Sequence, residues 1–190
     1  MKLVRIALAS HLYAISVALA FFACTARATD IPQHYVETDG ACWIDTGLVA
    51  KDSMTVEAWV LVPQQTTQDQ VLIGARHDGN NTRFSPIMFY QNNTFEVSFG
   101  NWADTKVAAP HSRWIRIKSV YTSSRIEYFV DGRRVYSSIS TRTAGTDAVA
   151  VRNLLIFAAD WNGTKGSLPM AAGTRLAAMK IWRGREFVRD

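Results

Sequence analysis

The chain has 190 residues, of which 48% are hydrophobic and 19% are charged. This length suffices for one domain with its own apolar core. Its 21 basic and 16 acidic residues give a formal net charge of +5. Lys2, Arg5 and Arg27 lie in an N-terminal segment with the features of a targeting signal. Without them eighteen basic residues face sixteen acidic ones, a net charge of +2. A balance this even argues against a nucleic-acid partner.

Residues 1–28 have the pattern of a secretory signal peptide. A positively charged start precedes an apolar run over 6–24, and Ala-Arg-Ala at 26–28 fits the small-x-small cleavage rule. We therefore expect cleavage, secretion of the protein to an extracytoplasmic location, and one domain over 29–190. The alternative is an uncleaved membrane anchor, because the apolar run is nearly long enough to span a bilayer.

Cysteine usage excludes an internal disulfide in the exported domain. Cys24 would leave with the signal, so Cys42 would be the only cysteine. A lone thiol in a strand-like run between Ala41 and Trp43 is typical of a small buried hydrophobe.

The rest of the chain consists of short β-like segments separated by turn residues, with no long helical periodicity. Pro63 ends one of them, and Asp45-Thr46-Gly47 and Asn92-Asn93 provide turn chemistry. The predicted strands are 34–37, 41–44, 54–62, 71–76, 86–91, 94–99, 106–108, 114–121, 125–130, 133–136, 154–158, 176–182 and 186–188.

The clearest pattern lies between Trp114 and Tyr136. Ile115 and Ile117 alternate with charged residues, and Asp131-Gly132 separates two β-rich runs, which is a strong hairpin signal. Such alternation is typical of antiparallel sheets with one buried and one wet face. Many short strands at regular spacing favour a β-sandwich or barrel.

Five stretches, taken in order, resemble the LamG-like jelly-roll domains of the concanavalin A-like lectin/glucanase superfamily. They are Tyr35–Gly47, Met54–Val60, Trp114–Tyr121, Phe129–Val135 and Gly173–Trp182. The likeness spans nearly all of residues 33–190. It implies an all-β fold, a two-sheet antiparallel β-sandwich of the jelly-roll type. That fold hosts lectins, adhesion modules, glycan-binding appendages and glycoside hydrolases, and does not by itself choose among them.

The glutamates do not show the pattern of the superfamily's hydrolases, which the resemblance implies would carry clustered carboxylates on one strand. Glycoside hydrolysis needs two carboxylates facing each other across a cleft. Here the glutamates are isolated from one another: Glu37, Glu57, Glu96, Glu127 and Glu186. Glu57 and Glu127 have strand context, but we interpret them as solvated residues or arginine partners. We therefore expect that the protein is not an enzyme, and a glycoside hydrolase is the lesser alternative.

The resemblance also makes a calcium ion possible, because many LamG-like domains hold Ca²⁺ at a loop rim. Asp and Asn oxygens suit this hard cation. The speculative ligands here are Asp78, Asn80 and Asp160, in loops that lack a calcium-loop consensus. Ordinary turns use the same residue types, and we favour that interpretation.

Loop-like tryptophans with polar neighbours provide the candidate ligand site, because sugars stack on aromatic rings and hydrogen-bond to polar side chains. An equal alternative is that each ring covers a sheet edge. The candidate residues are Asn101, Trp102 and Asp104 in one segment and Asp160, Trp161 and Asn162 in another. Three strand tryptophans are instead predicted to pack in the core: Trp59, Trp114 and Trp182.

Basic residues outnumber acidic ones in the central hairpins. They are Arg113, Arg116, Lys118, Arg125, Arg133 and Arg134. Such a stripe is usually a solvated face, and the alternative is a surface for an acidic glycan. Together these features predict an exported, non-catalytic binding module, lectin-like and directed at carbohydrate or a cell-surface glycan. The alternative is a structural or adhesion domain with a protein partner.

Overall fold

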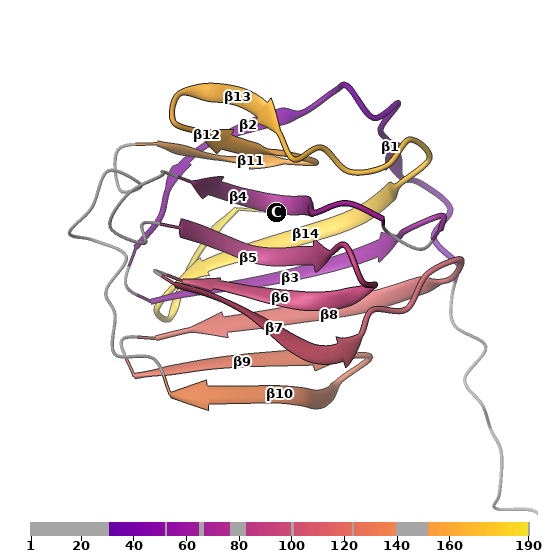
Figure 1. The fold of residues 1–190 in the computed structure, drawn as a ribbon. Coiled ribbons are helices and arrows are strands. Elements are labelled where there is room, and N and C mark those ends of the chain that lie inside the picture. The colour runs from indigo at the N-terminus through magenta and orange to yellow at the C-terminus, as the bar shows by residue number, and fades with distance from the viewer. Residues whose placement is uncertain are drawn as a thin grey trace, which may run out of the picture. The chain divides into compact units, whose positions relative to one another are not determined.

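Two β-sheets stacked face to face make up the part of the chain that the structure, a computed structural model, describes (Figure 1). It describes residues 31–51, 53–64, 67–76, 83–99, 101–122, 124–139 and 152–189. Pro32–Asp190 form one unit and Met1–Ile31 a separate one. The predicted signal peptide, 1–28, lies outside the described residues and stays a prediction.

The seven-stranded sheet carries the central hairpins that the sequence predicts. Its order is β1 (Val36–Glu37), β14 (Arg175–Arg183), β3 (Met54–Leu61), β8 (Trp114–Tyr121), β9 (Arg125–Val130) and β10 (Arg133–Ile139), and β15 (Glu186–Arg189) pairs with the end of β14. All pairs in this sheet are antiparallel.

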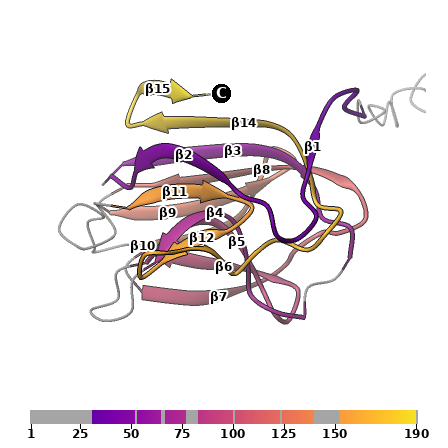
Figure 2. The ribbon, with the colours of Figure 1, turned by 90° about the horizontal axis from the view of Figure 1, so that it is seen from above.

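The eight-stranded sheet lies opposite, as the view from above shows with β14, β3 and β8 on one side and β5, β6 and β7 on the other (Figure 2). Its order is β13 (Thr164–Ser167), β12 (Ala159–Trp161), β4 (Gln70–Arg76), β5 (Arg83–Tyr90), β6 (Thr94–Phe99) and β7 (Asn101–Ala108). β11 (Asn153–Ile156) pairs with both β4 and β2 (Ile44–Val49). Among the described strands of this sheet, β12 and β4 form a parallel pair.

Alternation along the strands builds the core. Val56, Ala58 and Val60 of β3 are buried, while their neighbours Glu57 and Trp59 stay partly exposed on the outer face. The same period of two recurs in β8, so each strand contributes one face to the apolar layer between the sheets. The predicted fold class is therefore confirmed: an all-β, two-sheet β-sandwich of the jelly-roll type.

A bulge in β5 creates buried carbonyl groups that need a partner. Ser85 and Pro86 together face Gly74 of β4, because the register shifts between Ala75↔Phe84 and Ile73↔Ile87. Pro86 has no N–H to give to the ladder. A side chain at Gly74 would meet the Ser85 Oγ atom at 2.5 Å, so this close approach requires glycine.

Two tyrosines of the seven-stranded sheet satisfy these carbonyls. The Tyr128 hydroxyl lies within hydrogen-bond reach of the Pro86 carbonyl, of the Glu96 carbonyl at 3.1 Å and of the Tyr121 hydroxyl at 3.0 Å. The Tyr121 hydroxyl lies 3.4 Å from the Ser85 carbonyl. Burial raises the pKa of both phenols, so both remain neutral donors. These bonds connect the two sheets through the core.

Several predicted boundaries were wrong for local reasons. The strand predicted at 41–44 starts at Ile44, and Asp45-Thr46-Gly47 lies inside β2 as an irregularity in its pairing with β11. Pro86 lies in the middle of β5 and not at its start. The sequence analysis also missed the hairpin of β12 and β13.

Cys42 is exposed, which contradicts its predicted burial. It lies in a turn before β2, where the Asp39 carboxylate accepts hydrogen bonds from the Ala41 and Cys42 amides at 2.9 Å each. The turn holds this segment away from the core.

We expect Tyr128→Phe to lower the free energy of unfolding by about 1–3 kcal/mol, because it removes the donor for buried carbonyls. Urea unfolding would measure this. Tyr136→Phe is the matched control, because no hydrogen bond involves its hydroxyl among the described residues. Its effect should stay within about 0.5 kcal/mol. Equal losses in the two variants would contradict the assigned role of Tyr128.

Candidate functional site

The first predicted site does not lie in a loop. Asn101 and Trp102 belong to β7, where they pair with Phe99 and Ser98 of β6. The loop assignment was wrong because the polar residues beside Trp102 continue the strand, and ligand binding by this segment stays a prediction. Of these candidates, Asp104 has a described side chain.

The Asp104 carboxylate is occupied by neighbours within the hairpin. It accepts hydrogen bonds from the Thr94 hydroxyl at 2.5 Å, the Asn92 amide at 2.7 Å, and the Lys106 backbone and ammonium at 2.8 and 2.9 Å. Burial alone would raise the pKa of Asp104. The hydrogen bonds from Thr94, Lys106 and Asn92 outweigh it and hold the pKa well below its ordinary value. Through these bonds Asp104 of β7 stabilises the turn between β5 and β6, which contains Asn92.

The second predicted site lies at the β12–β13 hairpin, where Trp161 and Asp160 also contact neighbouring residues of the protein. Trp161 is partly buried at the end of β12, and the Arg76 guanidinium covers its ring at 4.1 Å from the centroid. Asp160 is 5% exposed, and its Oδ1 accepts from Arg152 at 3.2 Å and from the Gly163 amide at 2.9 Å. Asn162 is exposed in the left-handed conformation of the turn. Arginine side chains thus contact both Trp161 and Asp160, and ligand binding by this hairpin stays a prediction.

The Asp160 carboxylate, one of the predicted calcium ligands, pairs through Oδ1 with the Arg152 guanidinium at 3.2 Å, and calcium at this residue stays a prediction. Asp78 and Asn80 lie outside the described residues, so calcium there stays a prediction. Within the described ranges, no three His, Cys, Asp or Glu side chains gather to bind a metal ion. The same ranges contain no helix with the length and apolar character of a membrane span.

The outer face of the seven-stranded sheet carries the tryptophans that were predicted to pack in the core. Trp59, Trp114 and Trp182 are all partly exposed there, because each occupies the outward position of its strand. The Trp59 and Trp114 rings meet edge-on with centroids 6.0 Å apart, and Tyr35 lies 5.9 Å beyond Trp114. The alternation of buried and exposed residues puts these three rings on the solvent-facing side of the sheet. The prediction was wrong because it weighed the large apolar surface of each ring above its position in the alternation.

Cross-strand register gathers charged side chains around Trp59. Glu57 pairs with Lys118 of β8 and with Lys180 of β14, so the three form one row across the outer face. In the adjacent row Trp59 lies between Arg116 and Ala178. The Arg116 guanidinium stacks over the Trp59 ring at 4.7 Å from its centroid. The two rows form what we call the Trp59 surface: Glu57, Trp59, Arg116, Lys118, Ala178 and Lys180.

Several charged side chains around the Trp59 surface form ion pairs. The Glu127 Oε1 atom lies 2.9 Å from Nη1 of Arg134 and 3.6 Å from Nη1 of Arg125. Glu127 is thus an arginine partner, as predicted. Arg113 pairs with Asp131, and Arg175 with Glu37, at 2.9 and 2.6 Å.

On the Trp59 surface itself, no ion pair within 4.0 Å joins any of its four charged side chains to another described residue. A shallow pocket of about 180 Å³ lies among Glu57, Trp59, Arg116, Ala178 and Lys180. Its walls combine an indole ring, a carboxylate and two cations.

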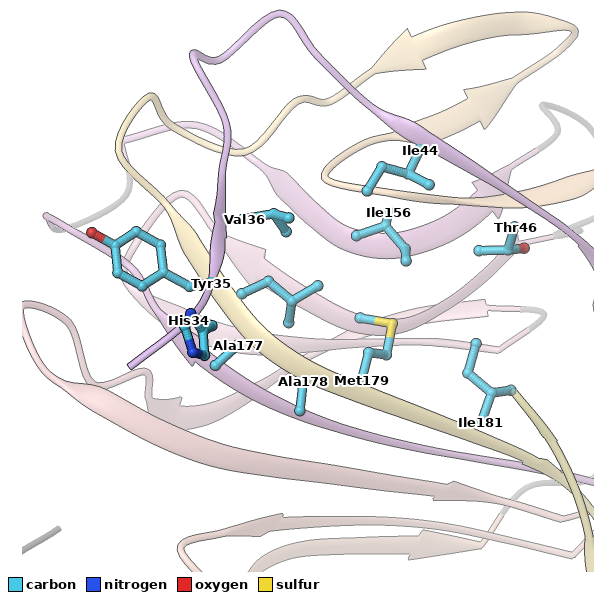
Figure 3. Close-up of a pocket in the computed structure, with 11 residues that line it drawn as sticks. His34, Tyr35, Val36, Ile44, Thr46, Ile156, Ala177, Ala178, Met179 and Ile181 are labelled. Carbon is cyan, nitrogen blue, oxygen red and sulfur yellow. The ribbon is translucent and has the colours of Figure 1, made fainter. Parts of the chain in front are cut away.

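A larger apolar groove of about 480 Å³ lies on the other side of β14. Figure 3 shows Met179 of β14 on the side of Ile44 of β2 and Ile156 of β11, whereas Ala178 points the other way. Ala178 lines both hollows, so the groove and the Trp59 surface meet at β14.

The edge of β14 is open along this groove. β1 pairs with Arg175 and Leu176, and β15 pairs with Ile181–Arg183. Between them, residues 177–180 have no strand partner on this side among the described residues. The backbone groups of an unpaired edge are a template for another strand.

Comparison with family profiles identifies the chain's relatives. The family Laminin_G_3, described as the concanavalin A-like lectin/glucanases superfamily, matches residues 36–182. The chain belongs to this family. The match confirms the predicted resemblance, and it covers every strand of the Trp59 surface. Comparison with curated protein sequences found no match.

Solved structures share the fold at low identity. Domain 4 of the arabinanase AbnA from Geobacillus stearothermophilus, solved with arabinotriose, is 17% identical, with a TM-score of 0.54 over 82% of this chain and 77% of that chain. The CBM40 module of a Ruminococcus gnavus sialidase, bound to α2,3 sialyllactose, is 13% identical, with a TM-score of 0.59 over 84% and 94%. A mutant NanB sialidase from Streptococcus pneumoniae is 12% identical, with a TM-score of 0.58 over 84% and 27%. This chain thus spans about a quarter of that sialidase.

We expect Asp104→Asn to lower the free energy of unfolding by about 1–3 kcal/mol at pH 7, because the carboxylate accepts charge-assisted hydrogen bonds. The lowered folded-state pKa means that this contribution is complete above the unfolded pKa of about 3.9 and is lost as the pH falls. The difference between wild type and variant should therefore shrink below about pH 4.

Urea unfolding at pH 7 and pH 3 measures both effects. Glu186→Gln serves as the control, because Glu186 is exposed and pairs through its backbone alone among the described contacts. An Asp104→Asn loss that stays the same at both pH values would contradict a role for the ionised carboxylate.

Proposed function

We propose that this protein is an exported, non-catalytic carbohydrate-binding domain that binds sugar on the Trp59 surface. One observation carries the proposal: a partly exposed indole ring, one carboxylate and two cations line a shallow pocket, and none of these three charged side chains forms an ion pair within 4.0 Å among the described residues. Sugars offer an apolar C–H face for such a ring and hydroxyl groups for the polar side chains. The pocket is smaller than sites for drug-sized ligands, which suits one sugar ring at a time.

The comparisons support this class of ligand. Two neighbours of the same fold were solved with arabinotriose and with sialyllactose bound. The Ala-Arg-Ala pattern at 26–28 supports export.

The outer-face carboxylates support a non-catalytic role. Glycosidases need two carboxylates about 5–9.5 Å apart with access to one bond. Glu57 and Glu127 lie two strands apart and in different rows of the sheet. Arg134 and Arg125 already hold the Glu127 carboxylate. This pair therefore offers no acid and nucleophile to a shared bond.

We expect Trp59→Ala to weaken binding by at least about tenfold to whichever oligosaccharide a glycan array identifies, because the apolar wall of the pocket is lost. Trp182→Ala is a matched control, since Trp182 lies on the same outer face and contacts Phe187 away from the pocket. Thermal unfolding of both variants separates lost binding from lost folding.

A Trp161→Ala variant should bind as wild type, because Trp161 belongs to β12 of the eight-stranded sheet and not to the sheet that carries the Trp59 surface. Loss of binding in Trp161→Ala with normal binding in Trp59→Ala would move the site to the β12–β13 hairpin.

A protein partner is a second candidate function, and the open edge of β14 favours it. An extended peptide can add to an exposed strand edge, with main-chain hydrogen bonds for affinity and side-chain pockets for specificity. Here four unpaired residues border an apolar groove, and Val36 and Ile44 beside it are 49% and 45% exposed. This arrangement would accept a short extended segment with an apolar side chain.

A five-residue peptide of alternating valine and threonine is a direct probe for this edge. Added to the ¹⁵N-labelled domain, it should shift the amide resonances of residues 177–180 and leave those of the paired residues 115–117 unchanged. Absence of any shift at millimolar peptide would count against strand addition.

A further inference from the structure

We propose that the Trp59 surface selects an acidic sugar, one that carries a carboxylate or sulfate group. This inference rests on the proposed function and specifies its ligand. It starts from three cations, Arg116, Lys118 and Lys180, that surround a single carboxylate, Glu57. The local charge is therefore positive on a domain whose remaining charges nearly balance.

The register brings these charges next to the Trp59 ring. Side chains directly opposite each other on antiparallel strands have Cβ atoms about 4.5–5.5 Å apart. Lys118 and Lys180 therefore flank Glu57 on both sides, and Arg116 lies one row away beside Trp59. A ligand placed on the ring has Arg116 beside it and the two lysines in the adjacent row.

The cations of this surface have no carboxylate partner within 4.0 Å among the described residues, in contrast to three arginines around it. Arg113, Arg134 and Arg175 each form an ion pair of 2.6–2.9 Å with a carboxylate. Lys118 and Lys180 adjoin Glu57, yet no ion pair within 4.0 Å joins them to it among the described residues. These two lysines can therefore pair with an anionic group on a ligand.

Each side chain then has a distinct part in recognition. Lys180 and Arg116 line the pocket and would donate charge-assisted hydrogen bonds to the anionic group. Lys118 adds positive potential from the adjacent strand. Glu57 accepts hydrogen bonds from sugar hydroxyls, and Trp59 contacts the C–H face of the ring. A neutral sugar would use the last two residues and gain nothing from the cations.

Calorimetry with a matched pair of ligands tests this inference. The probes are a glucuronate-containing trisaccharide and the same trisaccharide with its carboxyl groups reduced to alcohols. A third probe, the reduced trisaccharide carrying a sulfate ester, shows whether the surface prefers carboxylate or sulfate. We expect the acidic ligand to bind at least about tenfold more tightly than the reduced one at low salt. Raising the salt concentration should narrow this difference.

Variants identify the residues responsible. Lys118→Gln with Lys180→Gln should narrow the difference in affinity between the acidic and the reduced ligand, because two of the three cations are lost. Arg133→Gln removes one positive charge from an exposed position on β10 and should leave the preference intact. Glu57→Gln should strengthen binding of the acidic ligand, because it removes the opposing charge.

The outcomes separate the two levels of the argument. Equal binding of the acidic and reduced ligands, lost in Trp59→Ala, would overturn the charge selection and leave the sugar site standing. Absence of binding by any carbohydrate probe and by a broad glycan array, from a folded sample, would overturn both.

Discussion

The hydrogen bonds between two core tyrosines and the β5 bulge are the constraint on which the rest of the structure depends. Pro86 interrupts a central strand and leaves carbonyl groups facing the core, where an unpaired polar group is costly. Tyr121 and Tyr128 come from the opposite sheet and meet these carbonyls. The apolar layer between the sheets is not directional, whereas these bonds fix how β8 and β9 lie over β5 and β6.

That alignment sets the inner face of β8, and the outer face follows from it. A strand whose buried residues are fixed has no freedom to slip, because a shift by one residue would exchange its two faces. With Tyr121 held in the core, Arg116 and Lys118 must face outward beside Trp59 and Glu57 of β3. The proposed ligand surface is thus a product of register. It needs no loop to position it, because its side chains stand on three neighbouring hydrogen-bonded strands, β14, β3 and β8.

Much of the fold could be predicted from the sequence, because the alternation in 54–62 and the Asp131-Gly132 turn are local signals of strong physical origin. The bulges at Gly47 and Pro86 could not be predicted, because they depend on the register with the neighbouring strands β11 and β4. The site was harder still. The prediction placed tryptophans with polar neighbours in loops, whereas Glu57 and Lys180 are 123 positions apart in the sequence and become neighbours only through strand pairing.

A crystal structure of the domain with a bound acidic trisaccharide would test the central claim most directly. The account places the sugar ring against Trp59, its anionic group within hydrogen-bond distance of Arg116 or Lys180, and a hydroxyl on Glu57. A sugar bound at the β12–β13 hairpin or in the apolar groove beside β14, with the Trp59 surface bare, would contradict it.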